Sequence, residues 1–164
     1  MKTYKRNFQV PVVFTALISL LVVSGCEMPW TKKEEPKLLV VNVLNRDLYD
    51  DCHIPGSIHV DFMDVMDKAK EWSKSTKIVI YCANYACTAS SSAVRSLKNE
   101  GFDAYEYGAG MAGWFQAGYP VVGQAQSPYL HQANEPHAES AQDLPTISTE
   151  ALKKLLDASG LQQA

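Results

Sequence analysis

The segment Lys77 to Asn99 constrains the fold of this chain more than any other stretch. Its apolar run ends at Tyr81, Cys82 follows at once, and a helical pattern begins at Ala89 after a six-residue loop. This order predicts a buried strand, a loop, and a helix whose free N-terminal amides face the cysteine. Because those amides and the helix dipole favour negative charge, the position suits a thiolate and anions.

Strand and helix patterns on both sides of this segment set the fold class. Apolar runs predict further strands at residues 38–43, 58–60 and 104–107, and apolar periodicity predicts helices at residues 61–73, 89–99 and 111–117. Asp61 is a candidate N-cap, and Gly101 and Gly118 are candidate helix ends. Strands that alternate with helices over this length predict an α/β fold, with a small parallel sheet flanked by helices.

The first 25 residues are typical of a secretory signal peptide. Lys2, Lys5 and Arg6 precede an apolar segment at residues 10–23, and small residues then precede Cys26. This ending resembles the bacterial lipobox, which implies cleavage before Cys26 and lipid attachment to its sulfur. An uncleaved anchor, or an ordinary signal peptide followed by an incidental cysteine, is the alternative.

A lipid on Cys26 would make the membrane a partner of this chain, because several acyl chains hold a protein on a bilayer almost permanently. Glu27 is not the aspartate that is linked to inner-membrane retention in enteric bacteria. We therefore expect a protein of the bacterial cell envelope, anchored in the outer membrane and facing the periplasm.

Charge and cysteine content narrow the function further. Removal of the three signal-peptide cations would lower the formal net charge from −3 by three units, to −6, which gives no support to nucleic-acid binding. Cys52, Cys82 and Cys87 remain beyond the anchor. An odd number of cysteines in an oxidising compartment leaves at least one thiol free or engaged in chemistry.

The composition divides the rest of the chain into four parts. Residues 26–36 are polar and contain prolines, which predicts a membrane tether, and residues 37–123 hold the predicted domain. Residues 124–145 are rich in Gln, Ala, Ser, Pro and His, which predicts a flexible linker. Residues 146–164 include Ser148 and an amphipathic pattern, which predict a short strand and a capped helix.

Three motifs in this order resemble the rhodanese-like sulfurtransferase family. They are CHIPGSI at residues 52–58, Tyr81-Cys82 before the six-residue loop, and GAGMAGW at residues 108–114, which continues through AGYPV at residues 117–121. The resemblance implies that Cys82 carries sulfane sulfur as a persulfide, from a small sulfur donor to a thiol or another nucleophilic acceptor. It implies neither a metal nor a cofactor. The backbone amides of the active-site loop would stabilise the sulfur, and that loop comprises Ala83, Asn84, Tyr85, Ala86, Cys87 and Thr88.

The loop departs from the family pattern at two positions. Active members commonly have a glycine and a basic residue where this chain has Tyr85 and Cys87, and no Lys or Arg lies between Cys82 and Ala93. We therefore do not expect efficient turnover of thiosulfate. The family's Asp and Arg after the first buried strand are replaced by Asn42 and Leu44. Since both members of that charged pair are absent, no charge is left unpaired.

Four further side chains near these motifs require an interpretation. Cys87 is either a resolving thiol for Cys82 or a small residue that packs at a helix start. We interpret Cys52 as a packing residue, and His53 as a residue that orders the following turn. Thr88 is a candidate both for capping the next helix and for a hydrogen bond to the sulfur.

The C-terminal segment resembles the element with which family domains usually begin. Such domains start with a short strand and helix that this chain lacks before residue 38, whereas residues 147–156 read ISTEALKKLL. We predict a circular permutation in which residues 146–164 dock where the missing element would lie. A domain-swapped dimer and the start of a truncated second domain are the alternatives.

Three functions follow from these observations. The first is a lipid-anchored sulfurtransferase that uses a Cys82 persulfide. The second is a thiol–disulfide redox protein that works through Cys82 and Cys87, and the third is a non-catalytic binding module of the same fold.

Overall fold

The computed structural model describes residues 38–136 and 143–161, and it confirms the predicted α/β fold with a small parallel sheet. The sheet has the strand order β2-β1-β3-β4, and every neighbouring pair is parallel. The strands are β1 (Leu38–Asn42), β2 (Ile58–His59), β3 (Lys77–Tyr81) and β4 (Asp103–Tyr107). The predicted strands at residues 38–43, 58–60 and 104–107 therefore form, with bounds that differ by one residue.

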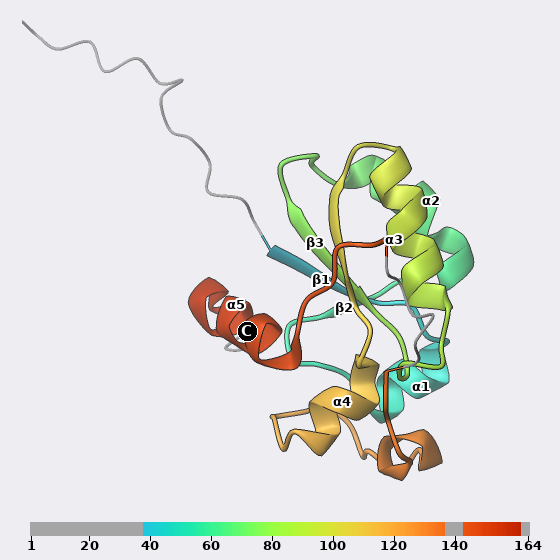
Figure 1. Ribbon diagram of the computed structural model, residues 1–164, viewed down its shortest axis with the longest axis vertical. Helices are drawn as coiled ribbons and strands as arrows, with labels where there is room; N and C mark the ends of the chain where they lie inside the picture. The colour runs from blue at the N-terminus through green and yellow to red at the C-terminus, as the bar shows by residue number, and fades with distance from the viewer. Residues whose placement is uncertain (1–37, 137–142, 162–164) are drawn as a thin grey trace, which may run out of the picture. The chain divides into compact units, whose positions relative to one another are not determined.

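Alternate side chains of the strands form two apolar clusters, one on each face of the sheet. Val41, Ile78 and Ile80 belong to the cluster that includes residues of α2 (Val65–Lys68) and α3 (Ala89–Asn99). The opposite cluster includes Val40 and Val79 together with residues of α4 (Gly110–Gln116), η3 (Pro128–His131) and α5 (Thr149–Ser159). Figure 1 shows α3 and α5 on opposite sides of the sheet.

The helices agree with the sequence pattern where that pattern is long. The predicted helix at residues 89–99 forms with those bounds, and Gly101 follows it with a φ of 79°. The predicted helix at residues 111–117 forms at Gly110–Gln116, with Gly118 at a φ of 73°. A positive φ is available to glycine without strain, which explains both helix ends.

Two helical regions differ from the prediction. Residues 61–73 form three short pieces, namely the 3-10 helix η1 (Phe62–Asp64), α2 and the 3-10 helix η2 (Ala69–Glu71). The prediction that Asp61 caps a single helix is wrong, because its side chain makes no capping hydrogen bond. The helix α1 (Arg46–Asp51) was not predicted from the sequence. It has six residues, none of which is buried, so it leaves no apolar periodicity to read.

The first part of the predicted flexible linker is packed against the domain, which corrects that prediction for residues 124–136. The Asp51 carboxylate accepts hydrogen bonds of 2.9 Å from the amides of Gln126 and Ser127. Leu130 is fully buried, and its carbonyl oxygen accepts a bond from the Gln116 side chain. Hydrogen bonds from main-chain amides to the Asp51 carboxylate and the burial of Leu130 therefore order a segment whose composition is typical of loops. Residues 137–142 of the predicted linker lie outside the described residues.

The C-terminal segment contacts both the edge and one face of the sheet. The Ile147 amide donates to the Glu106 carbonyl oxygen, and the Glu106 amide donates to Pro145, each at 2.9 Å. The helix α5 begins after Ser148, whose hydroxyl oxygen accepts from the Ala151 amide, and it buries Leu152 and Leu156 in the second apolar cluster. The interpretation of this arrangement as a circular permutation stays a prediction.

The predicted signal peptide and tether, with Cys26, lie outside the described residues. Within the described part of the chain, no helix has both the length and the apolar character required to cross a membrane.

Candidate functional site

The candidate site is the loop that follows β3 at the carboxyl edge of the parallel sheet. Cys82 is fully buried directly after Tyr81, and the loop continues to the start of α3. Two amides at the start of α4 hold the loop in place, because Met111 donates to the Cys82 carbonyl oxygen and Ala112 to that of Ala83, each at 2.9 Å. Parallel α/β sheets commonly place ligands at this edge.

The Cys82 sulfur is surrounded by hydrogen-bond acceptors. It lies 3.3 Å from the Cys87 carbonyl oxygen and 3.9 Å from that of Asn84, and the Ser90 hydroxyl is also 3.3 Å away. Carbonyl oxygens can only accept, so these contacts hold the thiol in its protonated form. The interaction with Cys87 and burial both raise the pKa of Cys82.

The amide that stabilises a charge on Cys82 belongs to Ser90, in the first turn of α3, and not to residues 83–88 as predicted; together with the Ser90 hydroxyl it acts to lower the pKa of Cys82. The amides of Ala89 and Ala83 face the sulfur of Cys87, which is partly exposed. The Cys82 thiol is the largest influence on the Cys87 sulfur, and with these amides it lowers the pKa of Cys87 to about 6. Because each thiol shifts the pKa of the other, Cys82 and Cys87 titrate as a pair.

Ser90 and Glu106 complete the surroundings of Cys82, and neither was predicted from the sequence. The Ser90 hydroxyl donates to the Glu106 carboxylate at 2.8 Å, and both residues are buried. Burial is the main cause of a raised pKa at Glu106. The available sequence signal was an acidic residue between two tyrosines, Tyr105 and Tyr107, in the strand predicted at residues 104–107. Lys, Glu and Asp are almost never buried without a partner, so its position alone pointed to one.

Thr88 plays neither of its predicted parts. It stands at the N-cap position of α3, but its side chain makes no capping hydrogen bond. The hydroxyl that contacts the Cys82 sulfur belongs to Ser90, two residues further along the chain.

The middle of the loop is held by the segment that follows α4. Asn134 accepts from the Tyr85 amide at 3.1 Å and donates to the Ala109 carbonyl oxygen at 2.8 Å. Asn84 accepts from the Ala86 amide. A cavity of about 230 Å³ opens between the loop and this segment, and its lining residues are Asn84, Tyr85, Ala86, Ala133, Asn134 and Glu135. Asn134 was not predicted as a site residue, because it lies within the predicted linker.

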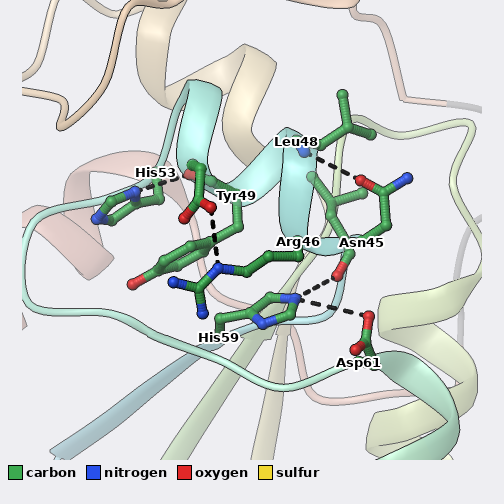
Figure 2. Close-up of polar contacts among 9 residues, drawn as sticks. Asn45, Arg46, Leu48, Tyr49, His53, His59 and Asp61 are labelled. Atoms are coloured by element: carbon green, nitrogen blue, oxygen red, sulfur yellow. Dashed lines mark hydrogen bonds and ion pairs between the residues drawn. The ribbon is translucent and has the colours of Figure 1, made fainter.

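A polar cluster orders the connections after β1 and β2, as Figure 2 shows. His53 stacks on Tyr49 with ring centroids 3.9 Å apart, and its Nδ1 lies 2.8 Å from the Tyr49 carbonyl oxygen. His59 contacts the Leu44 carbonyl oxygen at 2.8 Å and Asp61 at 3.7 Å. Both histidines have structural partners, which agrees with the interpretation of His53 as an ordering residue.

The contacts of Asn42 and Cys52 give both residues structural roles. The Asn42 side chain accepts from the Leu44 amide at 2.8 Å and so shapes the turn after β1. Cys52 is fully buried in the second apolar cluster, and burial raises its pKa to about 11, in agreement with a packing residue. Among the residues that the structure describes, no group of three or more His, Cys, Asp or Glu side chains is placed to hold a metal ion.

Comparison with known proteins links this geometry to a family. The sequence model of the rhodanese-like domain matches residues 30–117, more than half of the chain. An HTH-type transcriptional regulator, Rv0324 of Mycobacterium tuberculosis, is 30% identical over 90 residues, which are 55% of this chain and 40% of the regulator. The chain therefore spans well under half the length of this curated relative.

Solved structures show the same fold. The rhodanese-like domain of the Alr3790 protein from Anabaena has a TM-score of 0.50 and 30% identity, over 65% of this chain and 80% of that one. The BH2092 protein from Bacillus halodurans has a TM-score of 0.50 and 29% identity, over 54% of this chain and 65% of that one. The chain thus covers slightly less than two thirds of the BH2092 structure. With the family match and the strand–cysteine–loop–helix geometry, these likenesses establish that the chain belongs to the rhodanese-like domain family.

Proposed function

We propose that this protein is a sulfurtransferase that carries sulfane sulfur as a persulfide on Cys82 and passes it to a thiol acceptor. The main support for this function is the position of the Cys82 thiol at the base of the loop, with the Ser90 hydroxyl 3.3 Å from its sulfur. Membership of the rhodanese-like family supports the same reaction class. A buried cysteine that served only for packing would not require this polar loop and hydroxyl contact.

In the proposed reaction Cys82 gains one sulfur atom from the donor and then passes it to the acceptor, so the protein ends unchanged. The Cys82 thiolate attacks the sulfane sulfur of a persulfide or polysulfide, a new S–S bond forms, and the donor leaves as a thiolate or hydrosulfide. An acceptor thiolate then attacks the outer sulfur. The S–S bond to Cys82 breaks, the acceptor becomes a persulfide, and the Cys82 thiolate is restored.

The loop fits a persulfide or a hydrogen polysulfide, each of which carries a single negative charge on its sulfur chain, better than thiosulfate as donor. Thiosulfate carries two negative charges, and no Lys or Arg lies between Cys82 and Ala93 to bind them. The carbonyl oxygens of Asn84 and Cys87 near the sulfur also disfavour a dianion.

Turnover of inorganic polysulfide with glutathione as acceptor, measured as sulfide release, tests this proposal. We expect Cys82→Ser to lower the rate by about 10³-fold or more, because the hydroxyl is a far weaker nucleophile. Cys52→Ala is the matched control and should retain the rate, since Cys52 lies in the opposite cluster. Equal turnover by Cys82→Ser and the parent protein would exclude the proposal.

A thiol–disulfide redox function of Cys82 and Cys87 is the second candidate. The lowered pKa of Cys87 and the 3.3 Å contact of its carbonyl oxygen with the Cys82 sulfur favour it. In the same assay Cys87→Ser separates the two functions. Sulfur transfer through Cys82 alone survives this change, whereas a cycle that requires a disulfide between Cys82 and Cys87 stops.

We propose further that the chain acts in the bacterial cell envelope, anchored through a lipid on Cys26 and facing the periplasm. The basis is the signal-like residues 1–25 and the lipobox-like ending before Cys26. Palmitate labelling of the full chain in a bacterial host should label the parent and not Cys26→Ser. Equal labelling of both proteins would contradict the anchor.

A further inference from the structure

Glu106 is a buried carboxylate on the face of β4 that meets α3. Only 5% of the residue is exposed, and its strand neighbour across the sheet, Ile80, is apolar and fully buried. Burying a charge in such surroundings is costly unless the group is hydrogen-bonded. A carboxylate kept at this position therefore requires an explanation, and its side-chain partner is Ser90.

A single hydroxyl connects Glu106 to the candidate catalytic sulfur. Ser90, which is fully buried, lies 2.8 Å from the Glu106 carboxylate and 3.3 Å from the Cys82 sulfur. A serine hydroxyl has one proton to donate. When Ser90 donates to an ionised Glu106, its oxygen can only accept from the Cys82 thiol. When Glu106 holds the proton, Ser90 is free to donate to a Cys82 thiolate.

We propose that Cys82 and Glu106 share one proton through the Ser90 hydroxyl, and that this relay generates the attacking thiolate. The proposal rests on the sulfur-transfer function proposed above. As Cys82 attacks the donor, its thiol proton passes to the Ser90 oxygen while the Ser90 proton passes to Glu106. The negative charge moves from the carboxylate to the sulfur, and from there to the leaving thiolate of the donor. When the acceptor later removes the outer sulfur, the proton returns to Cys82 by the same path.

The relay provides a base for the Cys82 proton, which no other group near the sulfur provides in this proposal. The interaction with Cys87 and burial both raise the pKa of Cys82, and two carbonyl oxygens lie near its sulfur, so Cys82 requires a base in order to react at neutral pH. Glu106 acts through Ser90 and not on the reacting atoms, so it is a positioning residue whose role must be tested by a pH profile.

The groups that face Glu106 define the conditions of the test. The α3 helix contributes Ser90 and Arg95, and the loop contributes Cys87, whose pKa the Glu106 charge raises. The C-terminal segment meets Glu106 through the main chain of Pro145 and Ile147. Since Cys87 titrates beside Cys82, the relay is measured in a Cys87→Ser parent, where Cys82 is the only thiol of the loop.

The experiment measures the rate at which iodoacetamide alkylates Cys82, between about pH 5 and about pH 10. Mass spectrometry resolves the alkylation of each cysteine. In the Cys87→Ser parent we expect the alkylation rate to rise with pH until Glu106 is ionised, and then to stay constant through neutral pH. When Glu106→Gln or Ser90→Ala is added to this parent, the alkylation rate should rise only where a thiol ionises unaided, at about pH 8.5 or above. The rate at about pH 6.5 should then be lower by about 100-fold.

Two exposed residues provide matched controls. Glu100→Gln removes an exposed carboxylate, and Ser92→Ala removes an exposed hydroxyl of α3, so both should leave the pH profile unchanged. If Glu106→Gln fails to fold, Ser90→Ala tests the relay without changing a charge.

A purely electrostatic role of Glu106 would change the alkylation rate in the opposite direction. Loss of a negative charge beside a thiol lowers the thiol pKa, so without a relay Glu106→Gln would speed alkylation at neutral pH. A faster rate, an unchanged profile, or a Cys82 that stays unreactive in the parent would each overturn the proposal. Alkylation needs no sulfur donor, so the relay and the persulfide function can fail independently.

Discussion

Replacement of Gly110 by alanine is expected to destabilise the fold by about 2–4 kcal/mol and to abolish sulfur transfer. Gly110 has a φ of 60°, and a Cβ atom there would lie 2.7 Å from main-chain atoms of Cys82, Ala83 and Asn84. Main chain cannot rotate away as a side chain can. The added methyl group must therefore displace the loop that holds Cys82, or break the hydrogen bonds from Met111 and Ala112 to that loop.

Gly118→Ala is the matched control for this prediction. Gly118 has a φ of 73°, and nothing lies within 4 Å of the position that its Cβ would occupy. The control therefore measures only the cost of a left-handed alanine, about 1 kcal/mol, and should retain activity. Chemical denaturation gives the stabilities, and sulfide release gives the activities. Similar losses in the two variants would show that the contact of α4 with the loop is not required.

The double variant Leu152→Ala, Leu156→Ala is expected to lose at least about 4 kcal/mol of stability. Both leucines of α5 are fully buried in the apolar cluster that covers one face of the sheet. Each truncation of a buried leucine costs about 2–5 kcal/mol, and a domain of this size has only about 5–15 kcal/mol in total. The melting temperature should therefore fall steeply.

Lys154→Ala, at an exposed position of the same helix, is the control and should leave the melting temperature nearly unchanged. If the double variant, or deletion of residues 144–164, melted with the parent, α5 would not be part of the folded domain. The interpretation of the C-terminal segment as a permuted front end would then be wrong.

The sequence was sufficient for those parts of the fold that repeat a local pattern. The run at Lys77–Tyr81 and the periodicity at Ala89–Asn99 gave one strand and one helix with the observed bounds. Such long apolar patterns report directly which face is buried. The helix α1 escaped prediction because its six residues bury none of their side chains, and η3 escaped because Leu130 is one apolar residue in a polar segment.

The candidate site was predictable only as far as its cysteine. Cys82 follows from its place between strand and helix, but its contacts depend on residues that are distant in the chain. Glu106 reaches the sulfur from β4 through Ser90 of α3, and Asn134 holds Tyr85 from a segment further along the chain. No local pattern specifies which main-chain groups turn inward. The carbonyl oxygens of Asn84 and Cys87 lie near the Cys82 sulfur, and the amide that lowers its pKa is that of Ser90, outside the predicted loop.

Mass spectrometry of the protein after incubation with inorganic polysulfide shows directly whether Cys82 carries transferable sulfur. We expect the peptide that contains Cys82 to gain one sulfur atom, a thiol acceptor to remove this atom, and Cys82→Ser to abolish the gain. Cys52→Ala should behave as the parent does. A protein that gains no sulfur, or that instead loses two hydrogens in a reaction requiring both Cys82 and Cys87, would contradict sulfur transfer through Cys82.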